Sequence, residues 1–342
     1  MVEKNLDFRS DTVTHPSPEM KEAMIEAPLG DDVYGEDPTV NRLEELAAEM
    51  LGKKGGLFVT SGTMGNAVAI LAYTNRGDEI IVEESSHIYM NEVGGLAVLG
   101  SLMARTVKGD RGWITPEDIH RSVRRDNIHF PPTSLLCVEN THNSAGGVPI
   151  TVDQMKADWD AAKEHNLSVH LDGARVFNAA VALEVDVKEI AKYADSVQFC
   201  LSKGLAAPIG SMVVGSKDFI KKARKYRKML GGGMRQAGVI AAPGIIALTS
   251  MVDRLKEDHE NAKLLGEGLQ KLGVKLQFPV ETNMVYIDLS DLRWKRDRWG
   301  KECSKIGWRS NSGNKPRLCT HYGIEKEDIT KFLDEMGDII QG

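Results

Sequence analysis

The sequence predicts an α/β protein with a mostly parallel sheet that helices cover on both faces. Short apolar runs alternate with stretches of helical periodicity, and the helical stretches have the length that βαβ units need. The runs are uniformly apolar rather than alternating, which is typical of strands buried on both faces. The predicted strands are 57–59, 79–82, 135–138, 167–171, 197–201 and 211–214.

The helices between these strands carry their own boundary signals. Asp37 and Pro38 have the residue types of a helix cap and of the first helical position, and Gly52 is typical of a helix end. Further helices are expected over 67–73 and 152–165. A long helical stretch over 236–272 is expected to break near Pro243, because proline removes a backbone hydrogen bond.

At 342 residues the chain is long enough for two domains. We expect an N-terminal arm over 1–15, a large domain over 16–250 that contains the sheet, and a small α+β domain over 251–342. The small domain should contain strands at 284–289 and 317–320 and a closing helix from Lys326.

Composition and charge argue against several classes of protein. The net charge of −6 does not suit a protein that coats nucleic acid or an anionic membrane. The four cysteines form no C-x-x-C pair, so we expect no metal site, no disulfide framework, and reduced thiols in the cytoplasm. Residues 1–10 lack the apolar core of a signal peptide, and no stretch is apolar enough to span a membrane.

The strand ends carry the candidate chemistry, because ligands of open α/β sheets bind outside the carboxyl ends of the strands. Strand 57–59 leads into Gly62 and Thr63, whose backbone N–H groups could hold a phosphate at a helix start. Asp172 follows one strand, and Lys203, 31 residues later, follows another. Each residue also has an ordinary structural interpretation: Gly62 as a turn glycine, Asp172 as a helix cap and Lys203 as a surface lysine.

Together these residues are the parts that hold pyridoxal phosphate. Lys203 would form a Schiff base with the aldehyde, and Asp172 would pair with the pyridinium nitrogen. His87 follows strand 79–82 at the same edge of the sheet. Its imidazole could stack on the cofactor ring and exchange protons, or it could be a surface histidine in a loop.

Six segments in order make the sequence similar to low-specificity L-threonine aldolase, a family of fold-type I (aspartate-aminotransferase-like) pyridoxal-phosphate enzymes. They are Arg-Ser-Asp-Thr-Val-Thr at 9–14, Gly-Asp-Asp-Val-Tyr-Gly-Glu-Asp-Pro at 30–38, Ser-Gly-Thr-Met-Gly-Asn at 61–66, His-Leu-Asp-Gly-Ala-Arg at 170–175, Ser-Lys-Gly at 202–204, and Gly-Gly-Gly-Met-Arg-Gln at 231–236. The resemblance covers about residues 7–290 and resumes over 316–328.

The resemblance implies a set of cofactor-binding residues, namely Gly62, Thr63, His87, Asp172, Arg175, Lys203 and Arg235. Within this set Lys203 carries the cofactor, Asp172 meets the ring nitrogen, and His87 stacks on the ring. Arg235 is expected to reach the phosphate of a neighbouring subunit. Such enzymes are homo-oligomers, so we expect a dimer or a tetramer arranged as a dimer of dimers.

The resemblance also implies which residues contact the substrate. Ser10, Arg175 and Arg317 match residues that hold the substrate carboxylate, and Tyr34 matches an active-site position that the other subunit can supply. His129 matches a second histidine near the substrate hydroxyl. The residues implied in catalysis are Lys203, His87, His129 and Asp172.

The implied activity is aldol cleavage of L-threonine or L-allo-threonine to glycine and acetaldehyde. His87 is the first candidate for the base that takes the hydroxyl proton, with His129 or a water as alternatives. The same fold also serves serine hydroxymethyltransferases, β-eliminating lyases, aminotransferases and racemases. A pyridoxal-phosphate-binding regulator or an inactive structural subunit are the non-enzyme alternatives.

Residues 291–316 depart from the resemblance. Eight basic residues stand against three acidic ones there, with Trp294, Trp299 and Trp308 among them. We interpret this segment as a solvated helix whose tryptophans pack onto the large domain or onto a partner subunit. Binding of nucleic acid is the alternative.

Overall fold

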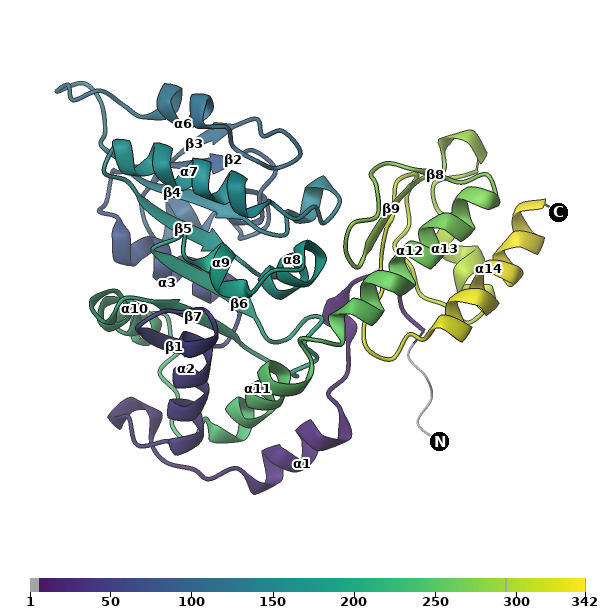
Figure 1. Cartoon of the computed structure of the whole chain (residues 1–342), viewed down its shortest axis with the longest axis horizontal. Helices are drawn as coiled ribbons and strands as arrows, with labels where there is room; N and C mark the ends of the chain where they lie inside the picture. The colour runs from purple at the N-terminus through teal and green to yellow at the C-terminus, as the bar shows by residue number, and fades with distance from the viewer. Residues whose placement is uncertain (1–5, 293, 342) are drawn as a thin grey trace.

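The computed structural model describes residues 6–292 and 294–341. Residues 1–5 of the predicted arm, with Glu3 and Lys4, and Arg293 of the basic segment lie outside the described residues. Figure 1 shows two lobes, each built on its own sheet, which helix α12 and the N-terminal segment connect. The division at residues 15 and 250 stays a prediction.

The large lobe confirms the predicted α/β class. Its seven-stranded sheet is parallel from β3 to β6, whereas β7 runs antiparallel to both of its neighbours. In sheet order the strands are β1 (Gly55–Val59), β7 (Ser211–Gly215), β6 (Ser196–Cys200), β5 (Ser168–Asp172), β4 (Thr133–Glu139), β2 (Glu79–Glu83) and β3 (Met103–Val107). The prediction missed β3, because this edge strand is polar and partly exposed and lacks the apolar run of a central strand.

Helices cover both faces of this sheet, and the side chains of each strand alternate between them. Phe58 of β1 packs into the core on one face, with α2, α7, α8, α9 and α11, whereas Leu57 and Val59 pack on the other face with α3 and α10. The helices of the lobe are α1 (Pro18–Glu26), α2 (Pro38–Met50), α3 (Gly62–Tyr73), α4 (His87–Met90), α5 (Gly95–Val98), α6 (Pro116–Ser122), α7 (Val152–Glu164), α8 (Val176–Leu183), α9 (Val187–Ala191), α10 (Lys217–Met229) and α11 (Gly238–Ser250).

Local helix signals predict α2 correctly and α11 wrongly. The Asp37 carboxylate accepts the N–H groups of Thr39 and Val40, as expected for a cap. The expected break near Pro243 is absent, and α11 continues through it. An interior proline removes one backbone hydrogen bond and crowds the carbonyl four residues earlier, but Pro243 and the small apolar residues around it are buried, and this burial favours the continuous helix. The break falls instead between α11 and α12 (Leu255–Lys271).

The small lobe consists of a three-stranded antiparallel sheet covered by helices. Its strands are β8 (Lys275–Leu276), β9 (Met284–Asp288) and β10 (Arg317–Cys319), and its helices are α13 (Arg298–Lys305) and α14 (Lys326–Gln341). Helix α12 joins the lobes physically, because Leu255 packs into the core of the large lobe whereas Leu265 and Leu269 pack into that of the small lobe.

The expectation for the tryptophans of segment 291–316 was wrong. Trp299 and Trp308 are buried in the core of the small lobe itself, and not on the large lobe or a partner. The N-terminal segment completes this core: the ring of Phe8 stacks on Trp308 with centroids 4.2 Å apart. A tight, local apolar cluster therefore holds the segment that leads to Arg317.

Among the described residues no single helix is long and apolar enough to cross a membrane. Helices α11 and α12 pass that test only as a pair, with a bend of 72° between them.

Candidate active site

Asp172 is the last residue of β5, and it is buried. Its Oδ2 accepts the Asn66 side-chain amide N–H at 2.9 Å, and its Oδ1 accepts the Ala174 backbone N–H at 3.1 Å. The Gln198 amide, in the orientation that satisfies both of its ends, also donates to Oδ1, at 2.9 Å. Donors from three separate residues therefore aim this carboxylate outward from the strand end.

Asn66 links Asp172 to two further buried groups. Its Nδ2 also donates to Glu92 Oε1 at 2.7 Å, and its Oδ1 lies 3.1 Å from His170 Nε2. Burial lowers the pKa of His170 to about 4, so this ring is neutral and donates from Nε2, while its Nδ1 faces Ser196. The direction of every hydrogen bond around Asn66 is thereby determined.

His87, the first residue of α4, lies against Glu92. The distance from its Nδ1 to Glu92 Oε1 is 3.0 Å. This hydrogen bond raises the pKa of His87; burial opposes the shift, and the charge of Asp172 adds to it. Burial raises the pKa of Glu92, and the His87 hydrogen bond works against that shift. A carboxylate at Nδ1 leaves Nε2 of His87 free to accept a proton.

The ligand atoms of His87, Glu92 and Asp172 all lie within 4.8 Å of one another. Groups of these types could also hold a metal ion. However, Asn66 already directs N–H groups at both carboxylates, and a cation would have to displace them.

Lys203 lies in the loop after β6 and is half-buried. Its charge acts on two neighbours: it helps to lower the pKa of Asp11, and it opposes protonation of His87. Asp172 acts on the same imidazole with the opposite sign. The amine and the acid that the sequence predicted for one cofactor thus have opposite electrostatic effects on His87.

Gly62 and Thr63 begin α3. The N–H groups of these residues precede the first backbone bond of the helix, which runs from Gly65 to Ser61. A Cβ on Gly62 would lie 3.0 Å from the Cys200 sulfur, so glycine permits a close approach of the helix start to the end of β6. This helix start suits an anion.

Arg175 is buried and paired with Asp11. Its Nε and Nη2 each donate to one carboxylate oxygen at 2.7 Å, and Asn283 donates a third bond to Asp11 at 3.2 Å. Asp11 therefore competes with the substrate carboxylate that Arg175 was expected to bind. Ser10 directly precedes Asp11, and its hydroxyl accepts the Thr12 N–H.

Arg317, the first residue of β10, reaches from the small lobe toward the large one. Its Nη1 donates to Asn143 Oδ1 at 2.6 Å, and its Nη2 donates to the Arg9 carbonyl at 3.1 Å. Its Nε is buried and has no hydrogen-bond partner among the described residues. A guanidinium with one unsatisfied buried donor is suited to an incoming carboxylate.

Three predicted site residues lie outside this cluster. Tyr34 is 74% exposed, and Arg235 is exposed and pairs with Asp31 at 2.9 Å, so both lie on one surface of the chain. His129 is exposed in the loop before β4. Its neighbour Arg124 binds Glu79 at the start of β2, which places this loop at the amino-end edge of the sheet, opposite Asp172.

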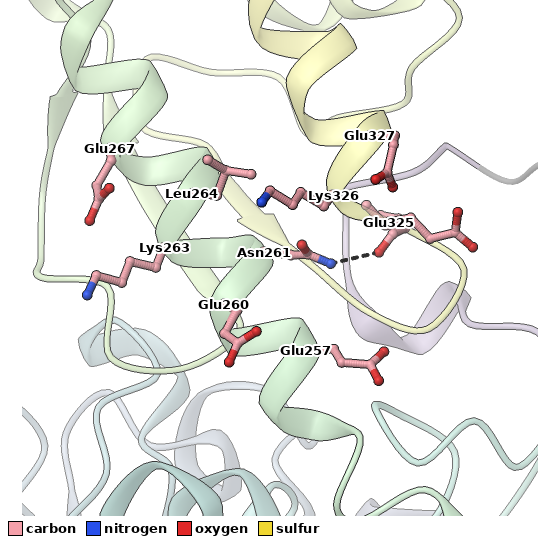
Figure 2. Close-up of a pocket in the computed structure, with 10 residues that line it drawn as sticks. Glu257, Glu260, Asn261, Lys263, Leu264, Glu267, Glu325, Lys326 and Glu327 are labelled. Atoms are coloured by element: carbon pink, nitrogen blue, oxygen red, sulfur yellow. Dashed lines mark hydrogen bonds between the residues drawn. The ribbon is translucent and has the colours of Figure 1, made fainter.

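A separate hollow, of about 610 Å³, lies between α12 and α14 of the small lobe (Figure 2). Glutamates and lysines line most of it, and Asn261 bonds the Ile324 carbonyl across it. None of the residues gathered at the strand ends contributes to it.

Sequence reasoning gave no role to Asp11, Asn66, Glu92, His170 and Asn143. Asn66 and His170 stood inside the quoted motifs, four residues after Gly62 and two before Asp172, so the motifs themselves carried a signal. Glu92 follows His87 by five residues in a segment with no recognisable pattern, and only the fold brings its carboxylate to the imidazole.

Comparisons with known proteins identify the family of this chain. The family model described as beta-eliminating lyase matches residues 7–292. The chain is 43% identical to the low specificity L-threonine aldolase of Escherichia coli K12, over 95% of this chain and 96% of that protein. It is also 43% identical to low-specificity L-threonine aldolase 1 of Arabidopsis thaliana, over 96% of this chain and 94% of that one.

The chain belongs to the low-specificity L-threonine aldolase family.

Solved structures place this threonine aldolase family member in the expected fold. A threonine aldolase of Leishmania major has a TM-score of 0.85 with 19% identity, covering 98% of this chain and 99% of that one. A putative L-allo-threonine aldolase of Listeria monocytogenes has a TM-score of 0.80 with 21% identity, covering 98% and 96%. The predicted aspartate-aminotransferase-like fold type I is confirmed, and the chain is a lyase.

Proposed function

We propose that this chain uses pyridoxal phosphate to cleave the Cα–Cβ bond of L-threonine and L-allo-threonine, releasing glycine and acetaldehyde. One observation carries the proposal: Asp172 ends β5 and Lys203 follows the adjacent parallel strand β6, and the His87 imidazole lies within 4.8 Å of the Asp172 carboxylate. Membership of the threonine aldolase family supports the same reaction.

The residues present fit this cofactor. Asp172 offers a carboxylate held by three donors, which suits a protonated ring nitrogen. Gly62 and Thr63 offer the free N–H groups of a helix start for the phosphate. Lys203 supplies the amine that bonds the aldehyde. When bound, pyridoxal phosphate supplies a conjugated, electron-withdrawing ring that accepts the electron pair of the bond breaking at Cα.

The chain's own residues then set the orientation of the substrate. The unsatisfied Nε of Arg317 can donate to the substrate carboxylate. The charges of Arg175 and Arg317 both act on Asp11, the residue after Ser10. Holding the carboxylate fixes the rotation about the bond from nitrogen to Cα. This rotation decides which bond at Cα aligns with the conjugated ring and breaks.

His87 is the residue that we propose for the proton transfer. Glu92 holds its Nδ1 side, so Nε2 can accept the proton of the substrate hydroxyl as Cα–Cβ breaks and the aldehyde forms. Lys203 Nζ, when it is not bonded to the cofactor, could donate a proton to Cα to yield glycine. One proton thus passes from the substrate hydroxyl to His87, and one passes from Lys203 to Cα.

We further propose a homo-oligomer in which partner subunits complete the site. Large apolar side chains are exposed next to the site, including Val93 and Val98 around α5, at 95% and 77%. Ile128, beside His129, is 97% exposed. His129 lies at the wrong edge of its own sheet, so it can approach a substrate only from another copy, and the exposed Tyr34 and Arg235 suit the same arrangement. Sedimentation velocity of the purified protein tests it.

All four cysteines are free and buried, which suits the cytoplasm that we propose as the location.

Product analysis with both threonine diastereomers tests the activity. Stoichiometric acetaldehyde and glycine are expected from each. The second candidate is β-elimination, which the family model favours by its description. It would release ammonia and 2-oxobutyrate from threonine, and detection of those products without acetaldehyde would refute the aldol reaction.

A further inference from the structure

Glu139 is a buried carboxylate at the end of β4 that touches two loops at once. Its Oε2 accepts the backbone N–H of His87 at 2.6 Å, and its Oε1 accepts the backbone N–H of Asn143 at 2.8 Å. Burial raises the pKa of Glu139, and the charge of His142 and these two N–H bonds work against that shift. Both donors belong to the main chain, so this side chain positions segments rather than side chains.

Each of the two segments leads to a residue of the proposed site. His87 begins α4 and carries the imidazole itself. Asn143 begins a 3₁₀ turn (Asn143–Ala145), and its Oδ1 accepts Arg317 Nη1 at 2.6 Å. The Asn143 carbonyl also accepts the Tyr286 hydroxyl of β9 at 2.7 Å. Asn143 is therefore the point where the large lobe holds the arginine of the small lobe.

Two further contacts join the same loops. His142 Nε2 lies 3.0 Å from Glu83 Oε2, and the Ser144 hydroxyl donates to the Ser85 carbonyl at 3.0 Å. The loops after β2 and β4 are thus linked by several hydrogen bonds, and Glu139 bonds directly to both His87 and Asn143.

We propose that Glu139 is a positioning residue that sets the placement of His87 relative to Arg317, with Asn143 transmitting its effect to the arginine. This inference rests on the roles proposed above for His87 and Arg317. Glu139 is a positioning residue rather than a catalytic one, because its two hydrogen bonds go to the main chain of His87 and Asn143, and it acts through them.

The test uses Glu139→Gln and Asn143→Ala in the holoenzyme. The amide nitrogen of the introduced glutamine cannot accept a hydrogen bond, so one of the two main-chain N–H groups loses its partner. The dissociation constant of glycine, measured by calorimetry, is expected to rise roughly tenfold in each variant. The KM for threonine should rise in parallel, whereas the stoichiometry of bound pyridoxal phosphate should not change.

The double variant shows whether the two residues act in series. If Asn143 transmits the effect of Glu139, the double variant weakens glycine binding little more than either single variant does. A multiplicative loss, or glycine affinity within twofold of wild type in folded Glu139→Gln, would overturn the inference. If Glu139→Gln does not fold, Asn143→Ala serves as the test instead. Unchanged glycine affinity in Asn143→Ala would also overturn the inference. Glu139→Asp, which keeps the carboxylate, should then fold.

Two controls separate this inference from the proposed function. Glu84→Gln changes an exposed carboxylate on the loop after β2 and should leave glycine affinity unchanged. Arg317→Leu should weaken glycine binding. If it does not, the proposed role of Arg317 is wrong; if it does while Glu139→Gln and Asn143→Ala bind normally, only the positioning inference is wrong.

Discussion

Asp11 and Arg175 form a buried, bidentate ion pair across 164 residues of sequence. Burial works to raise the pKa of Asp11, but the charge and hydrogen bonds of Arg175, together with the charges of Lys203 and Arg317, hold it well below its ordinary value. The pair anchors the N-terminal segment to the end of β5, beside the proposed site. It also occupies two donors of an arginine that was expected to bind the substrate carboxylate.

Replacing Asp11 with Asn should destabilise the protein by about 3–5 kcal/mol, because it leaves the Arg175 charge buried without a counter-charge. Urea unfolding measures this loss. Since the folded state lowers the pKa of Asp11, its stabilisation is complete above the ordinary value of 3.8 and is lost as the pH falls below that value. Asp160→Asn, which breaks an exposed pair with Lys156, is the control and should change little. Equal losses in both variants would contradict the prediction.

Lys203→Ala should abolish the visible absorbance that a lysine-linked pyridoxal phosphate gives. Aldol cleavage should fall by roughly 10²- to 10⁴-fold or more, because the variant loses both the covalent attachment and a proton-transfer group. The exposed Lys305→Ala should retain both properties. Turnover of Lys203→Ala near the wild-type level would show that another amine carries the cofactor.

Arg317→Leu should raise the KM for threonine roughly 10- to 100-fold, because a charge-assisted contact to the carboxylate is lost. Cofactor binding should survive, since the proposed cofactor contacts lie on the other lobe. Steady-state kinetics and a pyridoxal phosphate titration separate the two effects. Loss of the cofactor with an unchanged KM would reverse the assignment.

Glu92→Gln should move the acidic limb of the pH–activity profile to lower pH. The hydrogen bond to Glu92 is the main cause that raises the pKa of His87, so its loss lowers that pKa. A base must be deprotonated to act, and His87 would then be so at lower pH. Glu84→Gln is the control on a neighbouring loop. If the limb stays in place, a water or His129 is the base.

Asp158→Asn should stabilise the protein at alkaline pH. Burial raises the pKa of Asp158 to about 8, against a weaker opposing hydrogen bond from Trp113. The folded state therefore holds a proton that the unfolded state releases, and stability falls as the pH rises from about 4 to about 8. An asparagine keeps an oxygen for Trp113 without this cost. Thermal melts should show a gain that is larger at pH 8 than at pH 5, and an equal gain at both values would contradict the prediction.

The prediction of the fold succeeded where signals were local and failed where packing overrode them. The cap at Asp37 and the central strands depend on adjacent residues, and these elements were predicted close to their observed positions. The helix break predicted near Pro243 is absent, because burial of the apolar residues of α11 outweighs the local free-energy cost of the proline. The edge strand β3 went unrecognised because a strand with one partner needs no continuous apolar run.

The sequence alone determined which residues stand at the carboxyl ends of the strands. Gly62, Asp172 and Lys203 follow apolar runs directly, and parallel strands bring such ends to one edge. Only the tertiary structure decided what holds them. Glu92 on His87, Asp11 on Arg175 and Asn143 on Arg317 are pairings between segments without a shared local pattern. Such contacts arise when the two lobes and their loops pack together, and no spacing along the chain encodes them.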